Sequence, residues 1–224
     1  MSFTSGSVGA VLFDLDGTLI DSAPDLAGAG NDMRVARGLP VLPVSHFRPM
    51  VGSGARGMVE RALGVRPQDA AFAECRDEFL ARYEGRMTRE THVFPDLLPV
   101  LAAFTRHAMP WGIVTNKTSR FSVPLVRTLS HLDAAATLVC GDTTPHAKPH
   151  PAPLVEAARR LGVEPARCIY VGDDLRDVQA GVAAGMATVV VRWGYLGAGA
   201  PIESWGATHI IESPGELLKL VAMA

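Results

Sequence analysis

Residues 10–18 read AVLFDLDGT, a short apolar run that leads directly into two carboxylates, a glycine and a threonine. The run 10–13 predicts a strand that is buried on both faces, as in a parallel sheet. An extended backbone points Asp14 and Asp16 the same way, because side chains alternate along a strand. Gly17 permits the sharp turn that exposes both acids where the strand ends. This stretch therefore predicts two carboxylates side by side at the edge of a buried sheet.

The pairing of these two acids indicates metal chemistry. Two adjacent carboxylates repel each other unless a cation or a shared proton intervenes. Oxygen ligands suit Mg2+, and one carboxylate of such a pair is then free to attack phosphorus. The alternative is a solvated turn, since Asp and Gly are ordinary turn residues. More of the chain is needed to choose between the two.

The composition is that of an ordinary globular protein. Of the 224 residues, 48% are hydrophobic and 20% are charged, which is enough apolar material for a sizeable core. A net charge of -2 argues against a nucleic-acid partner, which would require a basic surface. No apolar run is long enough to span a membrane, and residues 1–7 lack the features of a signal peptide. The three cysteines form no C-x-x-C pair, so we expect a cytoplasmic protein from a reducing compartment.

Four later apolar runs predict the other strands of the sheet. They are short and continuous, as parallel strands are when helices cover both faces, and they span residues 111–114, 137–140, 168–171 and 188–191. Helix-like stretches, 153–161 and 177–184 among them, lie between these runs. We therefore expect an α/β fold built on a doubly wound parallel sheet.

The segment before Pro95 differs in its periodicity, which is helical and contains no convincing strand. Helices are expected over residues 24–38, 53–63 and 69–86. The last of them carries Cys75, Phe79 and Tyr83 on one face, which predicts a packed core. The predicted domains are an α/β core, residues 1–22 and 95–224, and an all-helical cap domain, residues 23–94.

Three further polar clusters follow predicted strands. They are Thr115, Asn116 and Lys117 after the run 111–114, Lys148 after the strand that ends at Cys140, and Asp173, Asp174 and Asp177 after the run 168–171. Doubly wound sheets carry their chemistry beyond the carboxyl ends of the strands, so these side chains should gather at one edge. The acids would hold a metal ion, and Thr115 with Lys148 would hold a phosphate group.

The four clusters, in this order and on these strand ends, resemble the four motifs of the haloacid dehalogenase superfamily. The resemblance extends from about Val8 to Leu220. It implies a helical cap inserted between the first and second motifs, as in phosphoglycolate phosphatase-like members. Each motif alone is a weak signal, but the ordered set is specific.

The resemblance also implies a role for each site residue. Asp14 would be the nucleophile that takes the phosphoryl group, and Asp16 the general acid and base. Mg2+ would be held by Asp14, Asp173 and the main-chain carbonyl of Asp16. The residues expected to bind the transferring phosphoryl group are Thr115, Asn116 and Lys148. Asp177 would orient metal-bound water or Lys148. Asp174 departs from the frequent Ser or Thr, and would lie in the outer coordination shell of the metal or face solvent.

Asp16 separates the possible reactions within the superfamily. The second acid of the first motif is missing in dehalogenase members, and ion-pumping ATPases carry Thr there. Its presence favours a hydrolase that acts on phosphate monoesters, because a leaving alkoxide needs a proton and an attacking water must lose one. Two alternatives remain open: a phosphosugar mutase with the same motifs, and a non-catalytic phosphate-binding module.

The substrate is constrained only to a small-molecule phosphate ester, with neither nucleic acid nor membrane as a partner. General similarity indicates a phosphoglycolate phosphatase. Finer features resemble a subgroup acting on N-acetylmuramic acid 6-phosphate, and these are WGIVTNK (111–117), GDDLRD (172–177), Gly194-Tyr195 and WGA (205–207). Thr208-His209 departs from the Asp-containing pattern of that subgroup. Both a monomer and a homodimer are compatible with the sequence.

Residues 52–57, GSGARG, match the G-x-G-x-x-G pattern of a dinucleotide site letter for letter. Such a site needs a preceding strand, which Pro43 and Pro49 disfavour. A glycine-rich cap loop is the better interpretation. It makes Arg48, Ser53 and Arg56 candidates for substrate specificity, with surface residues as the alternative. Lys117 is expected to be a surface charge at the start of a helix.

Overall fold

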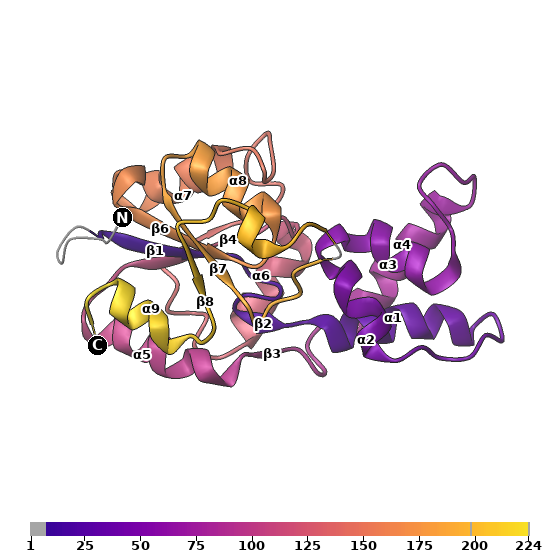
Figure 1. Ribbon diagram of the computed structural model, residues 1–224. Coiled ribbons are helices and arrows are strands. Elements are labelled where there is room, and N and C mark those ends of the chain that lie inside the picture. Colours follow the sequence, from indigo (N-terminus) through magenta and orange to yellow (C-terminus); the bar gives the residue numbers. More distant parts are fainter. Residues whose placement is uncertain (1–7, 198, 224) are drawn as a thin grey trace. The chain divides into compact units, whose positions relative to one another are not determined.

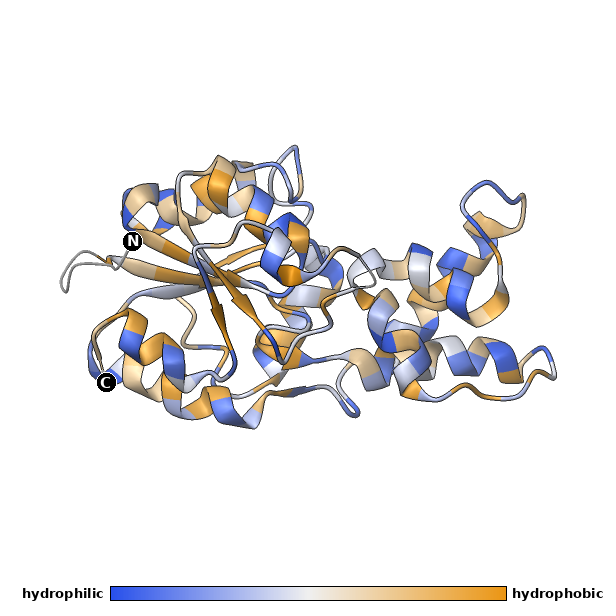
Figure 2. Cartoon of the chain, viewed as in Figure 1, coloured by the Kyte–Doolittle hydropathy of each residue, from blue (hydrophilic) through white to orange (hydrophobic). Residues whose placement is uncertain are grey.

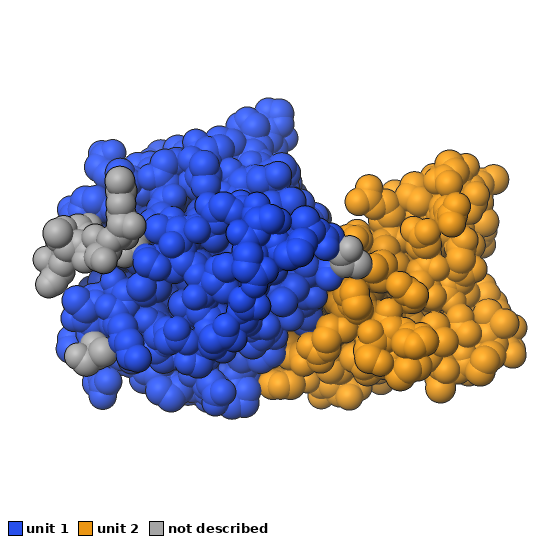
Figure 3. All heavy atoms as spheres, in the orientation of Figure 1, with its two compact units in different colours: residues 1–20, 93–224 blue, residues 21–92 orange. Residues whose placement is uncertain are grey.

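The computed structural model describes residues 8–197 and 199–223. Residues 1–7, where no signal peptide is expected, lie outside this range. The chain divides into two compact units, which Figure 3 colours separately: residues 1–20 with 93–224, and residues 21–92. We refer to them as the α/β unit and the helical unit.

The α/β unit is built on a six-stranded sheet with the order β5-β4-β1-β6-β7-β8, in which every pair is parallel (Figure 1). The strands are β1 (Ala10–Phe13), β4 (Trp111–Val114), β5 (Thr137–Val139), β6 (Cys168–Gly172), β7 (Ala187–Val191) and β8 (His209–Ile211). The chain builds outward from β1 to β4 and β5, then returns to place β6 on the other side of β1. Sheets of this kind carry their ligands where the order reverses. The predicted doubly wound α/β fold is confirmed.

The two central strands, β1 and β6, are buried along their whole length. Figure 2 shows the sheet as its most apolar part, which agrees with the continuous apolar runs of the sequence. The register pairs Phe13 with Val171, and the next main-chain N–H, that of Asp14, donates to the Val171 carbonyl at 2.9 Å. The strand β8 was not expected, because its sequence HII is too short to give a periodic signal.

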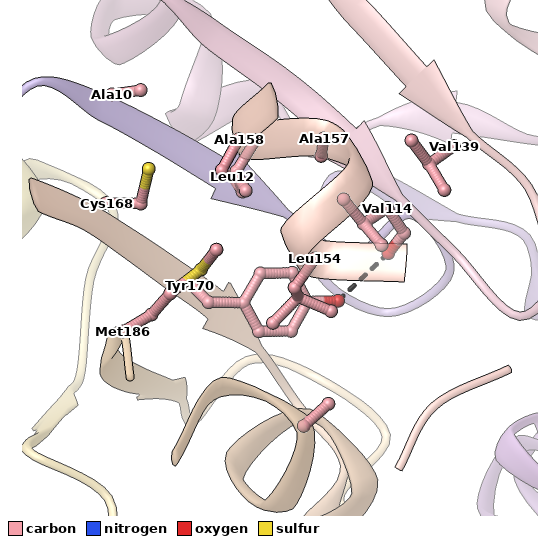
Figure 4. Close-up of a cluster of buried hydrophobic side chains, with 11 residues drawn as sticks. Ala10, Leu12, Val114, Val139, Leu154, Ala157, Ala158, Cys168, Tyr170 and Met186 are labelled. Atoms are coloured by element: carbon pink, nitrogen blue, oxygen red, sulfur yellow. Dashed lines mark hydrogen bonds between the residues drawn. The ribbon is translucent and has the colours of Figure 1, made fainter. Parts of the chain in front are cut away.

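Helices cover the sheet, and their bounds are α5 (Leu98–Arg106), α6 (Ser119–Thr128), α7 (Ala152–Leu161), α8 (Leu175–Ala183) and α9 (Gly215–Leu220). Short 3-10 helices are η2 (Pro95–Leu97), η3 (Pro165–Arg167) and η4 (Ile202–Ser204). Helix α7 packs against β1, β4 and β5, while α8 packs against β6 and β7. Figure 4 shows the resulting apolar cluster, in which Leu154 and Ala157 of α7 meet Leu12 of β1. Tyr170 lies in the same cluster, with its hydroxyl hydrogen-bonded to the Val114 carbonyl.

The helical unit contains α1 (Ala23–Val35), α2 (Val44–Phe47), the 3-10 helix η1 (Arg48–Ser53), α3 (Gly54–Leu63) and α4 (Phe72–Glu84). Helices α1, α3 and α4 pack against one another. As expected, Cys75, Phe79 and Tyr83 are the buried face of α4, and the last two rings stack with centroids 6.4 Å apart. Two short strands, β2 (Ile20–Asp21) and β3 (His92–Val93), pair in a separate sheet. No helix among the described residues is both long and apolar enough to cross a membrane.

The glycine-rich stretch 52–57 is not the loop that we expected. Its first two residues, Gly52 and Ser53, end η1, and α3 begins at Gly54. The φ of +62° at Gly54 interrupts the helical backbone between the two helices. The element before η1 is the helix α2 rather than a strand. The dinucleotide alternative therefore lacks its structural context.

Candidate active site

The turn after β1 brings the first acidic pair against the end of β6. Gly17 has a φ of +85°, a conformation that favours glycine. A Cβ atom at this position would lie 2.3 Å from Oδ2 of Asp173, so the missing side chain also makes room for that acid. The turn thus requires glycine at position 17 for two reasons: the positive φ angle and the space that Asp173 occupies.

Asp173 follows β6 and is almost completely buried. The Thr18 hydroxyl donates to its Oδ1 at 2.8 Å, and the Tyr195 main-chain N–H donates to its Oδ2 at 2.7 Å. These bonds favour the charged form, but burial has the larger effect, and together with the nearby Asp14 it raises the pKa of Asp173 well above its usual value. Trp193 ties the same region together, because its indole N–H donates to the Thr18 carbonyl at 3.1 Å.

Lys148 is the buried cation of the site. Its Nζ atom donates to the Asp177 carboxylate at 2.7 Å, the Tyr170 hydroxyl at 2.7 Å and the Val114 carbonyl at 3.1 Å. Burial disfavours the ammonium charge, but the carboxylates of Asp14 and Asp177 outweigh it and raise the pKa of Lys148 above its usual value. The cation is therefore charged at any pH at which the protein works.

The nucleophile predicted from the sequence, Asp14, has an unusual environment. Its Oδ1 lies 2.8 Å from Lys148 Nζ, yet this buried oxygen has no hydrogen-bond partner of good geometry among the described residues. The three N–H groups of the ammonium are already used by Asp177, Tyr170 and Val114. Burial raises the pKa of Asp14 to about 7, against the lowering effect of Lys148. Asp14 is thus close to a positive charge while one oxygen stays without a hydrogen bond.

The site is suited to a divalent cation. Asp14, Asp173 and Asp177 each offer a carboxylate oxygen, and the three atoms all lie within 4.8 Å of one another. Among the described residues, the ammonium in contact with this group is that of Lys148, which lies against Asp14 and Asp177. All three donors are oxygen atoms, which Mg2+ prefers, and a second cation would offset the burial and the mutual repulsion that raise the pKa values of Asp14 and Asp173.

Thr115 and Asn116 follow β4, as expected, and both contribute to the shape of the site. The Thr115 hydroxyl is buried and accepts the Lys117 main-chain N–H at 3.1 Å. The Asn116 side chain donates to the Lys148 carbonyl and accepts the Lys148 N–H, both at 2.9 Å. Asn116 therefore fixes the loop that carries Lys148, and phosphate binding by Thr115 and Asn116 stays a prediction.

Lys117 is not the surface charge that the sequence led us to expect. Its Nζ contacts Oδ1 and Oδ2 of Asp16 at 2.7 and 2.9 Å. The side chains are only 10% and 16% exposed, so the ion pair is largely shielded from solvent. The predicted general acid and base is thus held by a lysine that follows the neighbouring strand.

Asp174 and Asp177 shape the start of α8. The Asp174 carboxylate accepts the Arg176 N–H at 2.9 Å, and Asp177 accepts the Asp174 N–H at 3.0 Å, which together form a capping box. Asp174 also pairs with the Arg176 guanidinium at 2.7 Å. Burial raises the pKa of Asp174, but Arg176 outweighs it and the pKa falls below its usual value. Its carboxylate is thus occupied by α8 and Arg176, and its outer-shell role stays a prediction.

The three cap candidates belong to the helical unit. Arg48 pairs with Asp21 at 2.7 Å, and the same carboxylate accepts the Ala23 N–H at the start of α1. Ser53 and Arg56 are exposed. Arg48 is therefore held within its own unit, and substrate contacts by any of the three stay predictions.

Two residues of the site, Tyr170 and Lys117, were not expected there. Tyr170 places a polar hydroxyl in an otherwise apolar, buried strand. Because a buried tyrosine hydroxyl usually finds a hydrogen-bond partner, this pattern indicates a buried hydrogen bond. A signal for Lys117 exists in the composition, because the chain has only three lysines, namely Lys117, Lys148 and Lys219. Two of these three, Lys117 and Lys148, follow strands of the sheet. Because arginines supply most of the positive charge of this protein, lysines at these two positions indicate a role in the site.

Comparison with known proteins gives matches over most of the chain. A model of the haloacid dehalogenase-like hydrolases matches residues 8–185. An N-acetylmuramic acid 6-phosphate phosphatase of Pseudomonas aeruginosa is 39% identical over 215 residues, 96% of this chain and 95% of the relative. A phosphoglycolate phosphatase of Xanthomonas campestris pv. campestris is 43% identical over 210 residues, 93% and 94% of the two chains. The crystal structure of a "predicted phosphoglycolate phosphatase" from Haemophilus somnus 129pt superposes with a TM-score of 0.84 at 26% identity, covering 96% of this chain and 98% of that one.

Proposed function

Because the chain belongs to the haloacid dehalogenase-like hydrolase family and is a phosphatase like its named relatives, we propose that it hydrolyses a small phosphate monoester with Mg2+ and an aspartyl-phosphate intermediate on Asp14. One observation carries this proposal: carboxylate oxygens of Asp14, Asp173 and Asp177 lie within 4.8 Å of one another, and the buried ammonium of Lys148 contacts Asp14 and Asp177.

The proposed reaction has two steps. In the first, a carboxylate oxygen of Asp14 forms a bond to phosphorus while the ester P–O bond breaks, and Asp16 gives its proton to the leaving oxygen. In the second, water attacks phosphorus, the bond to Asp14 breaks, and Asp16 takes the proton that the water loses. The products are the alcohol and inorganic phosphate, and both aspartates return to their starting state.

The other residues provide charge and position. Lys148 and Thr115 would bind the phosphoryl oxygens, while Thr18 and Tyr195 hold Asp173 in place. When bound by Asp14, Asp173 and the Asp16 main-chain carbonyl, Mg2+ supplies the positive charge that lets a phosphate dianion approach Asp14. Without such charge the approach to about 4 Å costs several kcal/mol, even at an effective dielectric constant near 20.

The substrate class that we propose is a phosphate ester that also bears a carboxylate, such as 2-phosphoglycolate or N-acetylmuramic acid 6-phosphate. The names of the relatives at 43% and 39% identity support these two compounds. Because Arg48 is paired with Asp21, the exposed Arg56 is the better candidate to recognise the carboxylate. All three cysteines are free thiols, which supports the proposed cytoplasmic location.

The test is phosphate release by the purified protein with Mg2+, measured on both compounds and on p-nitrophenyl phosphate. We expect a carboxylated ester to give the highest kcat/KM, and acid quenching with 32P-labelled substrate to trap label on the wild type but not on Asp14→Asn. Phosphate transfer to a second position of a sugar, without release, would instead support a mutase. Release of phosphate without any trapped label from either ester would contradict the covalent mechanism.

A further inference from the structure

The ion pair between Lys117 and Asp16 is better defined than an ordinary surface pair. One ammonium contacts both oxygens of the carboxylate, at 2.7 and 2.9 Å, which fixes the rotation of the carboxyl group as well as its position. Exposed pairs contribute little because solvent screens them, but here both side chains are mostly buried. The ammonium of Lys117 thus restricts the orientation of the Asp16 side chain.

The main chain of Lys117 is itself held at three points. Its N–H donates to the Thr115 hydroxyl at 3.1 Å, and its carbonyl accepts the Gly141 N–H at 2.9 Å and the Ser122 hydroxyl at 3.1 Å. Gly141 must lack a side chain, because a Cβ atom there would lie 2.2 Å from the Asn116 carbonyl oxygen. The lysine thus extends from a rigid junction of β4, the segment after β5 and α6.

The two lysines of the site contact different acids. Lys148 lies against Asp14 and Asp177, whereas the ammonium of Lys117 contacts Asp16. In the proposed reaction, Asp14 acts on phosphorus and Asp16 acts on the proton. The two cations therefore serve different parts of the reaction.

We propose that Lys117 is a positioning residue that orients the carboxyl group of Asp16 for proton transfer. This inference rests on the proposed function. Lys117 acts through Asp16 and not on phosphorus. Its effect on the rate should therefore be larger for esters whose leaving group must be protonated. An alkoxide leaves poorly without one, whereas p-nitrophenolate leaves unaided. A positioned acid contributes about 10²–10⁴-fold to such a step, and loss of its orientation should forfeit part of that factor.

The first experiment measures first-turnover rates of Lys117→Met with Mg2+, using 2-phosphoglycolate as the alkyl ester and p-nitrophenyl phosphate as the activated ester. We expect the rate to fall about 10- to 100-fold for the alkyl ester and less than about 3-fold for the burst of p-nitrophenolate. Lys219→Met, which removes an exposed lysine of α9, is the matched control and should equal the wild type on both. An equal loss on both esters, or no loss on either, would overturn the proposal.

A double-mutant cycle gives a second test that a merely structural role would not pass. In an Asp16→Asn background the acid is already gone, so adding Lys117→Met should change the first-turnover rate by less than about 2-fold. Lys117→Arg should recover part of the alkyl-ester rate, because it restores the charge near Asp16. Independent losses that multiply in the double variant would contradict the proposal.

A third readout does not depend on activity. With only three lysines, selective 13C labelling at Cε gives three NMR signals. Asp16→Asn should shift the Lys117 signal and leave that of Lys219 unchanged. If Lys117→Met fails to fold, Ser122→Ala keeps the ammonium but loosens its main chain, and should lower the alkyl-ester rate in the same direction by a smaller factor.

These outcomes distinguish a failure of the proposed function from a failure of the role proposed for Lys117. A wild type that releases no phosphate from any ester contradicts the proposed function itself. A wild type that is active, with Lys117→Met equally active on the alkyl ester or an unmoved Lys117 signal in Asp16→Asn, contradicts only the role of Lys117.

Discussion

Two aspartates, Asp14 in the α/β unit and Asp25 in the helical unit, have carboxylates in different environments. Oδ2 of Asp25 accepts three hydrogen bonds, from the Glu90 N–H at 3.0 Å and from the N–H and hydroxyl of Thr91, both at 2.8 Å. Its other oxygen lies 3.7 Å from Nε of Arg86 and, like Oδ1 of Asp14, has no hydrogen-bond partner among the described residues. Oδ1 of Asp14 instead lies 2.8 Å from Nζ of Lys148, and burial raises the pKa of Asp14 to about 7.

The difference separates a structural acid from a reactive one. Hydrogen bonds from the chain hold Asp25 in place and join α1 to the segment after α4, which leaves that oxygen no further task. A nucleophile must remain accessible to phosphorus, and the side chain of Asp14 is 13% exposed whereas that of Asp25 is fully buried. Loss of Asp14 should therefore affect chemistry, and loss of Asp25 should affect stability.

The largest expected effect is that of Asp14→Asn on turnover. The amide keeps the shape of the side chain but cannot form an aspartyl phosphate, so kcat should fall by at least about 10³-fold. Phosphate release and thermal unfolding are measured on the same preparation, and the melting temperature should stay equal or rise. Retention of a tenth of the wild-type turnover would show that Asp14 is not the nucleophile.

Removal of divalent cations should come next in size. Dialysis against EDTA should lower turnover at least about 100-fold, because Asp14, Asp173 and Asp177 then repel an arriving phosphate. Added Mg2+ should restore activity, whereas Asp173→Asn should need a higher Mg2+ concentration for the same rate. Full activity in EDTA would refute the metal requirement.

Asp25→Ala should lower the free energy of unfolding by about 2–4 kcal/mol, because it leaves the three donors of Glu90 and Thr91 without an acceptor. Urea unfolding measures this change. Asp32→Ala is the control, since Asp32 accepts from the same arginine at 2.8 Å but is largely exposed. Residual folded protein should retain normal affinity for Mg2+, and a selective loss of metal binding would contradict the structural assignment.

The pH dependence of stability in the metal-free protein should reflect the raised pKa of Asp14. A carboxyl group whose pKa rises from 3.8 to about 7 on folding binds a proton more tightly in the folded state. Its stabilising effect is present below pH 4 and is lost as the pH rises through about 7, on the order of 4 kcal/mol in total. Unfolding free energies between pH 4 and 8 should fall less steeply for Asp14→Asn than for the wild type. Parallel curves would contradict the raised pKa.

The smallest effect concerns the arginines of the helical unit. Arg56→Ala should lower kcat/KM for carboxylated esters about ten- to hundredfold and spare p-nitrophenyl phosphate, because a charge-assisted contact is worth about 1.5–3 kcal/mol. Arg48→Ala should instead lower the melting temperature, since it removes the ion pair with Asp21. If Arg56→Ala affects both kinds of ester equally, Arg56 is a surface residue.

The family and the fold class could be predicted because they depend on local signals. Apolar runs mark β1, β4, β5, β6 and β7 within a residue or two, and the four motifs follow four of these strands. The family predicted from those motifs is confirmed by the match over residues 8–185. Where the local signal is short or misleading the prediction is wrong, as at β8 and in the stretch 52–57, where glycines are part of two helices.

By itself, the sequence determined which residues stand at the ends of the strands, because burial dictates apolar runs and the chain must turn where they end. Only the tertiary structure decided which cation meets which acid. Lys117 and Asp16 are separated by 101 positions, and Thr18 and Asp173 by 155. Such pairs depend on strand order, on parallel register and on loop paths, none of which is written in a local pattern. For that physical reason the sequence shows that two lysines follow strands of the sheet. Only the fold shows that Lys148 contacts Asp14, the proposed nucleophile, and that Lys117 contacts Asp16, the proposed acid.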